Sequence, residues 1–165
     1  MLQYEDKVYY YPGSDFRNLI SALKDASIDV GLCHGCFDVF HFGHAIHIAE
    51  SKASTGFLIV SLTTDKHVNK GLGRPIFTEE NRAMVLQSMR AVDAVVVNKE
   101  RTAEGIINFV KPNLLFKGAD YKGLHHEGLR REQEMVERNG GRLIYTEGDR
   151  YSSTKVLEEI KGDSI

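Results

Sequence analysis

The first predicted strand passes into a helix within residues 29–44, DVGLCHGCFDVFHFGH. The apolar first part of this stretch, Asp29 to Cys33, is typical of a buried strand, and a helix is expected over Phe42 to Ala53. The same alternation of short apolar runs with longer amphipathic ones continues along the chain. Further strands are expected at 57–62, 94–97, 114–117 and 142–145, and further helices at 15–26, 79–90, 102–110, 127–139 and 153–160. Since strands that alternate with helices form parallel sheets, the sequence predicts an α/β fold, doubly wound, with helices on both faces.

Length and composition indicate a single globular domain. The chain has 165 residues, of which 42% are hydrophobic and 27% are charged, and it contains no internal repeat or low-complexity segment. We therefore expect one domain over residues 1–165, with an N-terminal extension at 1–27 that carries the first helix.

The charge and hydropathy patterns exclude two classes of partner. The net charge of −2 is far from the basic balance of proteins that hold nucleic acid through their overall field, so no nucleic-acid partner is expected. No apolar run approaches the roughly 18 residues of a membrane span, and the first residues lack an apolar signal core. With two cysteines and neither of these segments, the chain is expected to be cytoplasmic and to have no membrane partner.

Two histidines stand where the first strand passes into its helix. His41 and His44 are three residues apart, so at a helix start they project from one face. Gly43 lets another group approach the backbone, and the free N–H groups of a first helical turn favour an anion. The pattern indicates a phosphate site with two imidazole donors. A pair of capping or surface histidines is the alternative interpretation.

Four motifs together carry a resemblance to a known family. Cys36-Phe37-Asp38 followed by His41-Phe42-Gly43-His44 resembles the HxGH signature of the nucleotidyltransferase superfamily that includes the cytidylyltransferases. Ser61 to Asp65 resembles that family's S-x-T/S-D element. Lys117 to Tyr121 is similar to the K-G-x-D-Y of the adenylyltransferase domain of bacterial ADP-heptose synthases. Thr146 to Gly148, with Ser152 to Thr154, resembles an element of glycerol-3-phosphate cytidylyltransferase, and the resemblance extends from about Asp15 to Ile160.

The resemblance implies a Rossmann-like fold and a reaction. A nucleoside monophosphate is transferred from a nucleoside triphosphate to a small phosphorylated acceptor, and pyrophosphate is released without a covalent enzyme intermediate. The acceptor is a sugar phosphate, a polyol phosphate or a phosphonate, Mg²⁺ accompanies the triphosphate with no metal held by the protein, and a homodimer is expected. Catalysis then rests on in-line positioning and on donors aimed at developing charge, a role that the resemblance assigns to His41, His44 and Lys70.

The resemblance also implies which residues surround the substrates. Nucleotide binding is expected from Gly35, Cys36, Phe37, Asp38, Gly43, Lys117, Gly118, Asp120, Thr146, Gly148, Ser152, Ser153 and Thr154. Phosphate or acceptor contacts are expected from Arg74, Arg82, Tyr121, His125 and Arg150. A solvated surface loop is the alternative for the basic segment 66–75, and a simple ion pair with Glu79 is the alternative for Arg82. His47 is expected to be an ordinary helix residue.

Two departures from the cytidylyltransferase element bear on the donor. Tyr145 replaces the arginine that opens this element, and Asp149 and Arg150 are inserted before Tyr151, where Arg150 offers a charge from another backbone position. The K-G-x-D-Y motif favours ATP, whereas the T-E-G and S-S-T elements favour CTP. We predict CTP as the donor, with ATP as the alternative.

Three functions of other classes compete with this interpretation. Cys33 and Cys36 form a C-x-x-C at a strand–helix junction, as in a redox pair, although Cys33 closes an apolar strand where an inert thiol is expected. Together with His41 and His44 they have the residue types of a zinc site, although the connection between the two pairs is much shorter than the usual length of about 12 residues. A nucleotide-binding module without catalysis is the third alternative.

Overall fold

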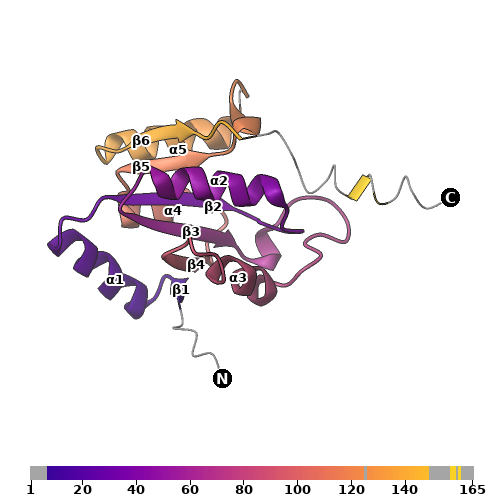
Figure 1. Ribbon diagram of the computed structural model, residues 1–165, viewed down its shortest axis with the longest axis horizontal. Coiled ribbons are helices and arrows are strands. Elements are labelled where there is room, and N and C mark those ends of the chain that lie inside the picture. The colour runs from indigo at the N-terminus through magenta and orange to yellow at the C-terminus, as the bar shows by residue number, and fades with distance from the viewer. Residues whose placement is uncertain (1–6, 125, 149–156, 159, 161–165) are drawn as a thin grey trace.

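The computed structural model describes residues 7–124, 126–148, 157, 158 and 160, and these contain a six-stranded parallel sheet (Figure 1). Its strands are β1 (Val8–Tyr11), β2 (Val30–Gly35), β3 (Phe57–Thr63), β4 (Ala94–Asn98), β5 (Leu114–Lys117) and β6 (Arg142–Tyr145). They are ordered β1-β4-β3-β2-β5-β6, and each neighbouring pair is parallel. The five predicted strands are confirmed, and β2, β3 and β4 end one or two residues later than predicted.

Strand β1 was missed by the sequence pattern. It forms the outer strand against β4, with Val8 opposite Val95 and Tyr11 opposite Asn98. Its residues VYYY are half-buried except for the exposed Tyr10, so they show neither a continuous apolar run nor a strict alternation. The strand exists because its backbone pairs with β4, a partner far along the chain.

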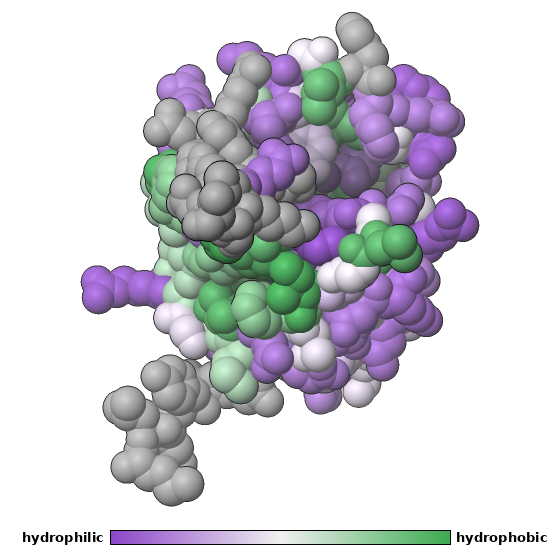
Figure 2. Space-filling model, turned by 90° about the vertical axis from the view of Figure 1, so that its right-hand side faces the viewer, coloured by the Kyte–Doolittle hydropathy of each residue, from purple (hydrophilic) through white to green (hydrophobic). Residues whose placement is uncertain are grey.

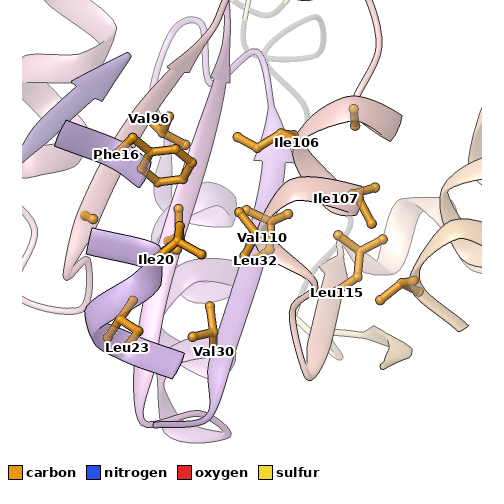
Figure 3. Close-up of a cluster of buried hydrophobic side chains, with 14 residues drawn as sticks. Phe16, Ile20, Leu23, Val30, Leu32, Val96, Ile106, Ile107, Val110 and Leu115 are labelled. Carbon is orange, nitrogen blue, oxygen red and sulfur yellow. The ribbon is translucent and has the colours of Figure 1, made fainter. Parts of the chain in front are cut away.

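Helices cover both faces of the sheet, as predicted. They are α1 (Ser14–Asp25), α2 (Phe42–Ala53), α3 (Glu79–Gln87), α4 (Glu104–Val110) and α5 (Glu127–Arg138), and the 3₁₀ turns η1 (Asp65–His67) and η2 (Ala119–Tyr121) follow β3 and β5. One core packs α1, α4 and α5 on the sheet, and Figure 3 shows Phe16 and Ile20 of α1 facing Leu32 of β2. The other core packs α2 and α3 on the opposite face through Ile48 and Leu86.

Two helices differ in length from the prediction by more than one residue. Helix α3 ends at Gln87, three residues before the predicted Arg90, because the following residues form turns that lead into β4. Helix α4 begins at Glu104, since the Asn98 side chain donates to the Thr102 carbonyl at 2.9 Å and holds that residue in the preceding loop. The predicted last helix at 153–160 lies mostly outside the described residues. No helix in the described ranges is long and apolar enough to cross a membrane.

The strand order creates a switch point beside β2. After β2 the chain builds β3 and β4 on one side, and it later builds β5 and β6 on the other side. Connections that leave adjacent strands in opposite directions open a crevice at their carboxyl ends, where open α/β sheets bind ligands. The ends of β2 and β5, at Gly35 and Lys117, are therefore where a site is expected.

Candidate active site

A crevice opens at the carboxyl edge of the sheet, where the predicted motifs meet. Figure 2 views this edge and shows hydrophilic side chains around a hollow. The predicted residues that line the crevice, here called the first cavity, are Gly35, Cys36, Phe37, Gly43, His44, Lys70, Lys117, Gly118, Asp120, Tyr121, Thr146 and Gly148. Segments far apart in the sequence are thus brought to one place.

His41 and His44 lie face to face at the start of α2. Their rings are stacked, with centroids 3.9 Å apart and planes inclined by 23°. His41 is the N-cap residue of α2, and its Nδ1 accepts a hydrogen bond from the Gly43 N–H at 3.1 Å. The capping alternative therefore applies to His41, which does not line the first cavity, whereas His44 does line it.

Both imidazoles favour the neutral form. Burial, together with the nearby His41 and Lys70, lowers the pKa of His44 to about 3. Burial and the charge of Lys70 also lower the pKa of His41, against a smaller opposing effect of Asp120. Within the described residues, the buried Nδ1 of His44 has no hydrogen-bond partner. An anionic ligand in the first cavity would raise both pKa values.

A second cavity adjoins the first. The two share His34, Gly35, Cys36, Lys70, Lys117 and Tyr121, and the second is further lined by Thr63, His67, Val68, Asn69, His126, Gly128, Leu129 and Glu132. Lys70 thus stands in the wall common to both, as does Lys117. A group bound in one cavity is next to a group bound in the other, and two cationic side chains stand at the junction.

Lys117 is held from the α5 side. Its ammonium forms a buried ion pair with Glu132 and lies 5.4 Å from the centre of the Tyr121 ring. The positive charge at the junction is therefore placed by α5 and η2 together. Neither Glu132 nor its helix was singled out by the sequence motifs.

Asp38 has a structural position, although nucleotide binding was predicted for it. Its carboxylate is fully buried and does not line either cavity. It accepts hydrogen bonds from Arg74 Nε at 2.6 Å, from the Ile76 N–H at 2.9 Å and from the Phe77 N–H at 3.1 Å. Burial alone would raise the pKa of Asp38, but these donors hold it below its usual value. Asp38 and Arg74 thus tie the segment before α3 to the end of β2.

Arg82 is also buried away from both cavities, so the structure does not place it against a triphosphate. Its guanidinium forms an ion pair with Asp65 and donates to the Cys36 carbonyl at 2.6 Å. The alternative pair with Glu79 is not what the structure shows, because the Glu79 carboxylate accepts the Asp65 N–H at 2.8 Å. Arg82 therefore links the loop after β2 to the segment after β3.

Two further histidines line the first cavity and were not predicted to do so. His47 hydrogen-bonds through Nδ1 to Thr146 Oγ1 at 2.9 Å, and His34 hydrogen-bonds through Nδ1 to Ser61 Oγ at 2.9 Å. The expectation that His47 is an ordinary helix residue is corrected. His47 follows His44 by three residues, the same spacing that separates His44 from His41. This repeat could have predicted that His47 lies beside His44 on the helix.

Other predicted residues lie outside the described part of the chain. These are His125, Arg150, Ser152, Ser153 and Thr154. Of the cysteines, Cys33 is fully buried, and burial raises the pKa of its thiol to about 12, which opposes the thiolate that redox chemistry needs. No group of three or more His, Cys, Asp or Glu side chains in the described ranges is placed to hold a metal ion.

The neutral histidines predict that acid destabilises the fold. Burial lowers the pKa of His34 to about 3 and that of His47 to about 4, whereas an unfolded histidine titrates near 6.5. Between those pH values the unfolded chain binds more protons than the folded chain, so the free energy of unfolding rises with pH. The stability that these neutral histidines contribute is therefore lost progressively as the pH falls below about 6.5. Thermal unfolding should show the melting temperature decreasing between pH 6.5 and 5. His47→Gln should flatten this slope, and an unchanged slope would contradict the assignment.

The chain is similar to known proteins in sequence. A family model described as cytidylyltransferase-like matches residues 32–159. Bifunctional protein HldE of Nitrobacter hamburgensis is 35% identical over 151 residues, which is 90% of this chain and 30% of that protein. The protein of the same name from Helicobacter acinonychis is 37% identical over 147 residues, 88% of this chain and 30% of that protein. The chain thus spans less than a third of the length of these curated relatives.

A solved structure has the same fold. The crystal structure of the lipopolysaccharide core biosynthesis protein from Thermoplasma volcanium superposes with a TM-score of 0.60 and 24% sequence identity. The match covers 76% of this chain and 99% of that one. The predicted Rossmann-like architecture is confirmed by this neighbour and by the sheet order.

Proposed function

The chain belongs to the cytidylyltransferase-like family of nucleotidyltransferases, and we propose that it transfers an adenylyl group from ATP to a small sugar phosphate. The observation that carries the proposal is the meeting of His44, Lys70 and Lys117 in one crevice with a second cavity beside it. A donor triphosphate in the first cavity and an acceptor in the second would meet at the two lysines.

The chemistry requires positioning and charge stabilisation. An oxygen of the acceptor phosphate forms a bond to the α-phosphorus of the donor, and the bond from that phosphorus to the bridging oxygen breaks. Pyrophosphate leaves with this bonding pair. Because a phosphate acceptor is already anionic near neutral pH, no base is needed to activate it. His44 would donate to the oxygens that gain charge, and Lys70 would neutralise the departing pyrophosphate.

Mg²⁺ belongs to this proposal as a companion of the triphosphate. Asp120 is the single carboxylate among the described residues that line the first cavity, which is too few for a protein-held magnesium cage. Phosphate oxygens and water would supply most ligands of the ion. Its chemistry when bound is to neutralise the charge of the triphosphate.

The choice of ATP rests on two observations. Lys117 to Tyr121, which resembles the adenylyltransferase domain of ADP-heptose synthases, runs from the end of β5 through η2 and lines the first cavity. The HldE relatives align over 88–90% of this chain, the region that contains this motif. These observations favour a heptose phosphate as acceptor. CTP, predicted from the T-E-G element, stays the second candidate because Thr146 and Gly148 also line the cavity.

A pyrophosphate-release screen tests the proposal. Four nucleoside triphosphates are each combined with a heptose phosphate, glycerol 3-phosphate and a phosphonate in the presence of Mg²⁺. We expect ATP with the heptose phosphate to give the highest rate, at least about tenfold above the other pairs. Fastest release with CTP and glycerol 3-phosphate would establish the second candidate. If no pair releases pyrophosphate, the proposal fails and a binding module without catalysis replaces it.

A further inference from the structure

His47 lines a part of the first cavity that the second cavity does not share. The two cavities meet at Lys70 and Lys117, whereas His47, Thr146 and Gly148 line only the first cavity. The phosphates of the donor must lie at the junction for transfer to occur. Its nucleoside must then occupy the part of the first cavity that the second does not share, and His47, on α2 one turn after His44, lines that part.

The hydrogen bonds of His47 determine which of its ring nitrogens carries the proton and which can accept a hydrogen bond. Burial and the nearby Lys117 keep the imidazole neutral, so it carries a single N–H. Thr146 Oγ1 donates its one hydrogen to the Lys117 carbonyl at 3.4 Å and so accepts from His47 Nδ1 at 2.9 Å. With the proton on Nδ1, Nε2 has a free lone pair. Glu50, the nearest carboxylate on α2, is engaged by the Glu147 N–H at 2.8 Å.

We propose that His47 reads the nucleobase by accepting a hydrogen bond at Nε2 from an exocyclic amino group. Adenine and cytosine carry such an amino donor, whereas guanine and uracil carry a carbonyl oxygen at the corresponding position. An acceptor facing an acceptor leaves both groups without a partner and is disfavoured. The site therefore admits ATP and CTP and rejects GTP and UTP. This inference rests on the proposed function, since it requires a nucleotide in the first cavity.

Binding affinities test the inference without an acceptor and without turnover. Dissociation constants are measured calorimetrically, with Mg²⁺, for ATP, CTP, GTP, UTP and purine riboside triphosphate, which is ATP without its amino group. Wild-type protein is expected to bind ATP about five- to tenfold more tightly than purine riboside triphosphate, the scale of one neutral hydrogen bond. Its preference for ATP over GTP is expected to be at least about tenfold.

Variants locate the effect at His47. His47→Leu should abolish the preference for ATP over purine riboside triphosphate, and His47→Gln, which restores an acceptor, should recover part of it. His67→Leu removes an imidazole from the second cavity and should leave the preference unchanged. If His47→Leu fails to fold, equal affinity of the wild type for the two purine nucleotides still overturns the inference, and a reduced preference in His47→Gln still assigns the effect to His47.

The outcomes separate this inference from the proposed function. Equal affinity of the wild type for all five nucleotides, or a preference that survives in His47→Leu, overturns the inference while leaving transferase activity intact. A preference that depends on His47, in a protein that releases no pyrophosphate with any acceptor, supports the inference and removes the proposed reaction. If none of the nucleotides binds, both are overturned.

Discussion

Replacing His44 by alanine is expected to lower the turnover number by about a hundred- to a thousandfold, the usual effect of removing one transition-state donor. The side chain lines the first cavity, and its buried Nδ1 has no partner among the described residues. Its contribution should appear mainly in kcat, because the charge it would stabilise develops during the transfer. Steady-state pyrophosphate release with saturating substrates measures the change.

The matched control for this variant is the neighbouring histidine. His41→Asn keeps a good N-cap residue at the start of α2 but removes the ring that stacks on His44. A large loss of turnover in His41→Asn, with an unchanged melting temperature, would give His41 a chemical role besides the cap. A folded His44→Ala variant with near-normal turnover would refute the role proposed for His44.

Replacing Asp38 by alanine is expected to lower the free energy of unfolding by about 3–5 kcal/mol, the cost of breaking a buried ion pair from one side. The change removes the carboxylate that accepts from Arg74 and from the backbone of Ile76 and Phe77. A guanidinium and two N–H groups would lose this acceptor in a buried place. Urea unfolding followed by circular dichroism measures the loss.

An exposed ion pair provides the control for Asp38. Glu127 pairs with Arg131 on the surface of α5, where their side chains are 74% and 43% exposed. Glu127→Gln should change the free energy of unfolding by no more than about 0.5 kcal/mol. If Asp38→Ala instead kept its stability and lost only nucleotide affinity, the role predicted from the sequence would be correct and the structural role would be wrong.

Local sequence patterns were sufficient to predict the class of fold and the edge of the sheet where the motifs meet. Alternating strands and helices imply a parallel sheet, and all strands of a parallel sheet end at one edge, so motifs that follow β2, β5 and β6 had to converge there. That convergence follows from local patterns and from chain direction, both of which can be read along the sequence.

The roles of individual side chains depend on contacts between distant segments, which the folded chain alone reveals. Asp38 and Arg82 carry charges that suit a nucleotide site, but each is buried against partners from other segments, Arg74 and Asp65, whose proximity no local pattern records. His47 hydrogen-bonds to Thr146, and the backbone of β1 pairs with β4. Both contacts join segments that are far apart in the sequence. The residue types were visible in advance, whereas which groups face one another depends on contacts between distant parts of the chain.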